Sequence, residues 1–128
     1  MIEGVGGVSA SQYYQPERPN PEAIKAAVTV ATEYTKVLVN ISSIMMEVAR
    51  LKEAESRGDA GGIELAIHNL VKLGADELKA LATFTSAKET LKGMKDQFSD
   101  KRIKDAIDDL DHHPINAAKT LLDLFTKP

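Results

Sequence analysis

The sequence predicts an all-α protein: an antiparallel hairpin of two long helices with two short C-terminal helices, together a three- or four-helix bundle. Three observations support this fold class. Apolar residues recur at helical spacing over long stretches, and no useful length of the chain alternates apolar and polar residues as a strand does. The composition is 43% hydrophobic but only 5% aromatic, and such an aliphatic chain suits packing of helix on helix.

The N-terminal residues differ in composition from the rest of the chain. Residues 1–20 are rich in Gly, Ser, Gln and Pro and show no helical period, so we expect a flexible N-terminal tail. Residues 21–128 carry the periodic pattern. Their length fits one helical domain.

The first long helix has clear start and stop signals. Asn20 is a good N-cap and Pro21 suits the first helical position. No breaker interrupts the sequence before Arg57, and Gly58 supplies a stop. The sequence therefore predicts a helix that is about 55 Å long at 1.5 Å per residue.

Two apolar rows run along this helix. One alternates steps of four and three residues, which is the spacing of a coiled-coil seam, and the other repeats every seven residues beside it. The first row is Ala27, Ala31, Tyr34, Leu38, Ile41, Met45 and Val48, and the second row is Val30, Val37, Ile44 and Leu51. We expect the first row to form the packed seam, and both rows together to contact two neighbouring helices.

A second long helix follows the reversal at residues 58–62. Its apolar period runs over residues 63–98, and Gly74 is a weak point that costs about 1 kcal/mol relative to Ala. Ser86 and Glu89 form a capping-box pattern, so the segment is either one long helix or two helices that meet near Thr85. One long helix with a kink is the favoured interpretation.

Two short helices follow. Ser99 and Asp100 form a cap for the first, and His113 and Pro114 mark the start of the second. The apolar residues of both recur at helical spacing, so each has one side suited to packing on the hairpin.

Composition and charge exclude several classes of protein. The chain has no cysteine, which excludes disulfides, thiol catalysis and thiolate metal sites. Sixteen basic and nineteen acidic residues give a formal net charge of -3, and no basic stripe marks a nucleic-acid surface. No residues stand out as a catalytic triad or as an acid–base pair, so we expect a protein that is not an enzyme and needs no cofactor.

The N-terminus lacks the basic and apolar regions of a secretory signal peptide, and no apolar run is long enough for a membrane span. We therefore expect a protein without a membrane span that is cytoplasmic, or exported without a cleavable signal peptide.

The middle of the first helix is apolar nearly all round. Val39 and Met46 lie seven residues apart and outside both rows, on the side that should face water. Adjacent methionines also suit adaptable contact surfaces. The sequence therefore predicts an interface for a protein partner or for self-association, formed by Val37, Val39, Ile41, Ile44, Met45 and Met46. The alternative is that the short helices and the tail cover these side chains.

A tail with few charged residues followed by a long helical hairpin resembles, in general architecture and without a diagnostic motif, the small components and substrates of bacterial specialised secretion systems. This resemblance and the apolar helix lead to the same functional hypothesis. The protein is expected to be an assembly subunit, an adaptor or a small chaperone that acts by protein–protein interaction.

Two other functions stay open. The segment around His68 resembles the helix of histidine-phosphotransfer domains, which implies a signalling bundle with His68 as phosphoacceptor. Lys72 and Gly74 follow this histidine at four and six residues, whereas that family has them at three and four.

The third hypothesis is a metal-responsive regulator. Asp105, Asp109 and His112 fall at helical positions i, i+4 and i+7 and provide carboxylate and imidazole ligands. The alternative interpretation is an acidic, solvated helix that ends at a proline turn.

Overall fold

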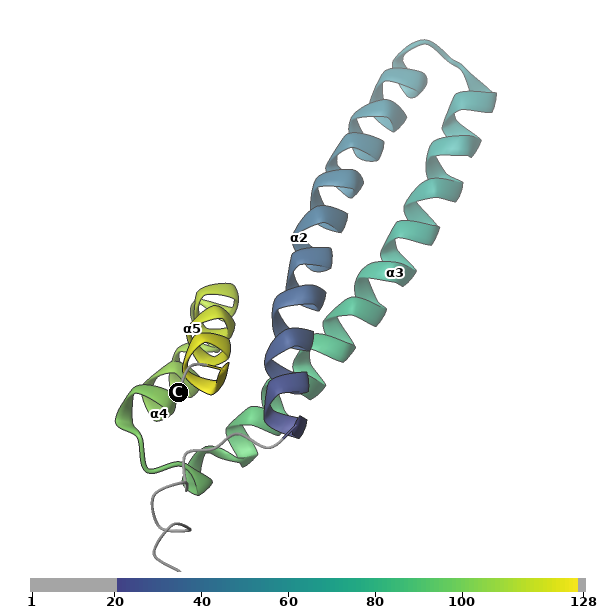
Figure 1. The fold of residues 1–128 in the computed structure, drawn as a ribbon. Helices are drawn as coiled ribbons and strands as arrows, with labels where there is room; N and C mark the ends of the chain where they lie inside the picture. Colours follow the sequence, from purple (N-terminus) through teal and green to yellow (C-terminus); the bar gives the residue numbers. More distant parts are fainter. Residues whose placement is uncertain (1–20, 127–128) are drawn as a thin grey trace, which may run out of the picture. The chain divides into compact units, whose positions relative to one another are not determined.

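The computed structural model describes residues 21–126 and confirms the all-α class, with two long helices followed by two short ones (Figure 1). Within these residues there is no strand. The elements are α2 (Pro21–Ser56), α3 (Ala60–Gly93), the 3-10 turn η1 (Lys95–Gln97), α4 (Lys101–Asp109) and α5 (Pro114–Thr126). The expected N-terminal tail lies outside the described residues.

The reversal between the long helices is tight. Gly58 has a φ of 65°, a left-handed conformation that a residue without a Cβ adopts at little cost. A carboxylate oxygen of Asp59 accepts a hydrogen bond from the Gly62 N–H at 3.0 Å and so caps the next helix. This cap explains why α3 begins at Ala60, three residues before the predicted start near residue 63.

The second long helix is one continuous helix. α3 passes through Thr85 and ends at Gly93. The hydroxyl of Thr90 donates to the Ser86 carbonyl at 3.0 Å. Both residues therefore lie within the helix, and no helix end separates them. The prediction of a helix to residue 98 was too long, because Phe98 has extended backbone angles (φ -108°, ψ 137°) that place its ring in the core.

The described residues group into two compact units. The first contains residues 21–31 and 85–126 of the described chain. It holds the largest fully buried side chains, namely Val30, Leu91, Ile103, Ile107, Leu110 and Leu121. The rings of Phe98 and Phe125 stack with their centroids 5.6 Å apart. The first unit therefore has an aliphatic core of the usual kind.

The second unit, residues 32–84, is the antiparallel part of the hairpin and has a thin core. Half of its buried residues are alanines; the six are Val37, Glu47, Ala54, Ala66, Ala80 and Phe84. Two side-chain contacts fix how the helices pair. The rings of Tyr34 and Phe84 lie 5.0 Å apart, and the Asn69 amide donates to Glu47 at 3.1 Å. The numbers of two residues that face each other across the hairpin therefore add up to about 117.

Candidate functional site

In the second unit the two apolar rows of α2 have the opposite roles from those expected. Val37, from the second row, is only 4% exposed, whereas Leu38, Ile41 and Met45 of the first row are 44–68% exposed. The prediction that the first row forms the packed seam is therefore wrong in this segment. Both rows have heptad spacing. The helix α3 contacts α2 at Tyr34 and at Glu47, and the second row lies between these two positions around α2, so α3 packs on the second row.

Most of the exposed apolar residues of the second unit lie on one side of the hairpin. Leu38, Ile41 and Met45 follow Tyr34 by four, seven and eleven residues, which keeps them on the Tyr34 side of α2. On this side, the exposed apolar residues of α3 follow one another by four, seven and three residues, so they form one stripe along that helix. We call this surface the hairpin face; it comprises Leu38, Ile41, Met45, Ile67, Val71, Leu78 and Leu81.

The opposite side of the second unit is polar. A cleft of about 410 Å³ is lined there by Ser43, Met46, Glu47, Arg50, Asn69, Lys72, Leu73 and Asp76. The Glu47 carboxylate is buried in the wall of this cleft and receives hydrogen bonds from Arg50 at 2.6 Å and from Asn69 at 3.1 Å. Each oxygen of this buried charge thus has a donor, as buried charges require.

The structure separates the predicted interface residues into four groups. Val37 is buried in the hairpin seam and Ile44 is half-buried beside it. Ile41 and Met45 belong to the hairpin face, whereas Met46 lines the polar cleft. Val39 is exposed outside the hairpin face.

The α3 half of the hairpin face was missed from the sequence. Ile67, Val71, Leu78 and Leu81 carry a detectable signal, because their spacings of four, seven and three residues form a second apolar stripe. Which of the apolar stripes of α3 faces α2 becomes clear only from the Tyr34–Phe84 contact.

A charged residue of α3 lies in the seam with α2, on the same helical face as the buried residues Ala80 and Phe84. Glu77 precedes Phe84 by seven residues, and its neighbours three and four positions away are Leu73, Gly74, Ala80 and Leu81. Glu77 is half-buried, and its Oε1 atom is buried without a hydrogen-bond partner.

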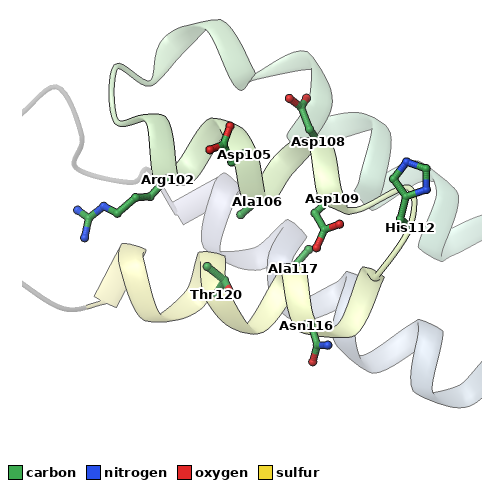
Figure 2. A pocket seen from close by; sticks show the side chains of 9 residues that line it. All are labelled: Arg102, Asp105, Ala106, Asp108, Asp109, His112, Asn116, Ala117 and Thr120. Atoms are coloured by element: carbon green, nitrogen blue, oxygen red, sulfur yellow. The ribbon is translucent and has the colours of Figure 1, made fainter.

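The acidic residues of the metal hypothesis line a pocket of about 510 Å³ between α4 and α5 (Figure 2). Asp105 pairs with Lys101 at 2.9 Å, and Asp109 lies 3.0 Å from the Nδ1 atom of His113. Figure 2 shows Asp105 and His112 at opposite ends of the row of acids. Within residues 21–126, no three His, Asp or Glu side chains are arranged to hold a metal ion. The geometry thus adds nothing in favour of this hypothesis.

Lysines of the same unit neutralise the end of α4. Asp111 accepts hydrogen bonds from Lys92 at 2.8 Å and pairs with Lys88 at 3.1 Å, while Lys95 pairs with Asp108 at 2.7 Å. The hydrogen bonds from Lys92 and then Lys88 lower the pKa of the Asp111 carboxyl, and the bond to Asp111 raises the pKa of Lys92.

His68 is exposed on α3 in the second unit, outside the hairpin face. Its role as phosphoacceptor stays a prediction.

None of the helices in residues 21–126 is both long and apolar enough to cross a membrane. Comparison of the chain with protein-family models, with curated proteins and with solved structures finds no match.

Proposed function

We propose that this chain is a non-enzymatic interaction protein whose hairpin face packs against the helices of a protein partner. An assembly subunit, an adaptor or a small chaperone would act in this way. The observation that carries the proposal is that Leu38, Ile41 and Met45 form a row with coiled-coil spacing, and this row is largely exposed in the second unit.

The apolar surface is large enough for a specific contact. The seven side chains of the hairpin face are each 38–71% exposed. Full burial of such a side chain contributes about 1.5–3 kcal/mol, so covering the exposed halves gives a gross gain on the order of 5–10 kcal/mol. Even after the costs of association, a gain of this size supports binding of moderate affinity.

The thin core of the second unit supports the same function. Helices in water depend on tertiary packing more than on their intrinsic propensity. In this unit three of the six buried residues are alanines, and larger side chains such as Val71 and Leu78 are 69% and 71% exposed. A partner helix on the hairpin face would give these side chains the packing that the hairpin lacks.

The adjacent residues Met45 and Met46 provide a matched test. They are 68% and 57% exposed but lie on opposite sides of the hairpin. Because the chain has no cysteine, Met45→Cys and Met46→Cys each create a single thiol that can carry a photoreactive crosslinker. The labelled proteins would be irradiated over a concentration series and, separately, in an extract of the source cells.

We expect discrete crosslinked species from position 45 and none, or only diffuse products, from position 46. The species can contain a second copy or another protein, and mass spectrometry identifies which. The proposal fails if position 45 gives no discrete species under either condition, or if both positions give the same products.

A further inference from the structure

We infer that Met45 is an oxidation site, and that its conversion to the sulfoxide by a peroxide prevents the hairpin face from binding its partner. This inference rests on the proposed function, because it concerns the chemistry of the same surface. It is carried by the reactive side chains of the chain, by the exposure of each methionine and by the position of Met45 on the hairpin face.

Methionine sulfur is the most readily oxidised group of this chain. The sequence has four methionines, no cysteine and no tryptophan, so no thiol or indole competes for the oxidant. A peroxide converts the thioether of methionine to the sulfoxide. Met45 is the one sulfur-containing residue of the hairpin face, whose other members are leucines, isoleucines and a valine.

The three methionines within residues 21–126 differ strongly in exposure. Met45 and Met46 are 68% and 57% exposed, whereas Met94 is 6% exposed in the first unit. A peroxide reaches an exposed sulfur directly in the folded protein, but it reaches a buried sulfur only after local opening of the structure. Met45 and Met46 should therefore be oxidised while the core around Met94 is still intact.

Met45 lies near the middle of the hairpin face along the two helices. By the pairing of the helices, Val71 of α3 lies at about the level of Met46, and Ile67 and Leu78 lie on either side of that level. The side chains at the centre of an interface contribute most of the binding energy. A change at Met45 should therefore weaken binding more than a change at the edge of the hairpin face.

Oxidation places a polar group at this central position. Hydrogen peroxide transfers one oxygen atom to the Sδ atom of Met45, the sulfur loses two electrons, and the peroxide leaves as water. A flexible apolar side chain becomes a polar one. A partner that covers the new oxygen without donating to it removes the hydrogen bonds that water made, so the complex is weakened.

This modification is reversible. A methionine sulfoxide reductase removes the oxygen as water, while two thiols supply the two electrons and become a disulfide. Loss of binding through Met45 should therefore be restored by the reductase and a thiol reductant, unlike loss of binding through irreversible damage.

The rate of oxidation tests the first part of the inference. The full-length protein would be treated with dilute hydrogen peroxide, and peptide mass spectrometry would measure the oxidised fraction of each methionine over time. We expect similar rates at Met45 and Met46, each at least about tenfold above the rate at Met94, because the exposed fractions differ by about that factor. Equal rates at Met45 and Met94 overturn the inference.

Crosslinking tests the effect on binding. Val71→Cys carries the photoreactive crosslinker on the hairpin face, in chains that also have Met45, Met45→Leu or Met46→Leu. Each labelled protein is oxidised until the exposed methionines have reacted, freed of peroxide and irradiated as described for position 45. We expect oxidation to reduce the discrete species at least about tenfold in the chains that keep Met45, and less than about twofold in Met45→Leu, which has no sulfur there.

The outcomes separate the inference from the proposed function. Circular dichroism should show the same helix content before and after oxidation, and a loss of helix in the wild type overturns the inference. Species that survive oxidation of Met45, or that Met45→Leu loses equally, overturn the inference and leave the proposed function in place. If Val71→Cys gives no discrete species before oxidation, the proposed function is contradicted and the inference falls with it.

Discussion

At the scale of single residues, the least expected feature is the buried carboxylate of Glu47 in the seam of the hairpin. Its two oxygens receive bonds from Arg50 and Asn69, and the Asn69 bond joins α3 to α2. A buried polar pair of this kind contributes less to stability than to the choice of one helix pairing over its alternatives. A shift of one heptad along α3 would remove the amide from Glu47.

Replacing Asn69 with leucine should lower the free energy of unfolding by about 1–3 kcal/mol, because the buried Glu47 Oε1 atom loses its donor. The double variant Glu47→Leu/Asn69→Leu should regain most of this loss, since the unpaired charge is gone. Urea denaturation measures both. Lys36→Ala, which breaks an exposed ion pair with Glu33, is the control and should change stability by less than about 0.5 kcal/mol. Equal effects of the Asn69 and Lys36 variants would contradict the role of the buried pair.

Asp111 should make the first unit sensitive to acid. Its pKa is lowered in the folded state, so the stabilisation is fully present above the unfolded value of about 3.9 and is lost as the pH falls through the lower folded value. Asp111→Asn removes this contribution. The difference in unfolding free energy between wild type and variant should therefore shrink toward zero as the pH is lowered from about 5 to 2. A constant difference over this range would show that the Lys92–Asp111 bond does not stabilise the fold.

At the scale of secondary-structure elements, the sequence signals that locate helix ends were reliable where a specific residue makes the cap. Pro21 begins α2, and Pro114 begins α5. The Asp100 carboxylate caps α4 by accepting from the Arg102 N–H at 2.8 Å. The end of α3 was predicted poorly, because the extended backbone of Phe98 depends on burial of its ring in the first unit, which no local pattern reveals.

The apolar surface was only partly predictable for a similar reason. The sequence shows two heptad rows on α2, but spacing alone does not decide whether the row of Val37 or that of Met45 meets α3. Contacts between residues far apart in sequence decide it, namely Tyr34 with Phe84 and Glu47 with Asn69. The predicted interface therefore included Ile41 and Met45 on the hairpin face together with Val37, which the seam buries.

Two glycines of the hairpin should respond in opposite ways to alanine. Gly74 lies inside α3 with open space around it, so Gly74→Ala should raise the unfolding free energy of the monomer by about 0.5–1 kcal/mol. Gly58 has a positive φ, so Gly58→Ala should be destabilising by about 1 kcal/mol despite open space around it. Thermal unfolding at low concentration measures both effects. A loss of stability in Gly74→Ala would mean that a side chain meets an obstacle there.

At the scale of the whole molecule, the two units differ in how much of their apolar surface they bury. The six largest fully buried side chains belong to the first unit, whereas the second unit exposes most members of its hairpin face. The chain therefore combines a part that is stable through its own core with a part that has apolar surface available for binding.

Hydrogen exchange should reveal this difference. At low protein concentration, amides of α4 and α5 around Ile107 and Leu121 should exchange slowly, and amides of α2 and α3 near the reversal should exchange faster, because the core of the second unit is thin. Uniform exchange rates along both units would contradict this distribution of stability.

The tight reversal at Gly58 has a kinetic consequence. Contacts beside it join residues close in sequence, the Glu47–Asn69 bond spans 22 residues, and the Tyr34–Phe84 contact is the most distant of the three. Closing a short loop loses less chain entropy than closing a long one. We therefore expect the two arms to zip together from the reversal outward, so that the correct alignment of the helices is set early, before the aromatic rings meet at the far end.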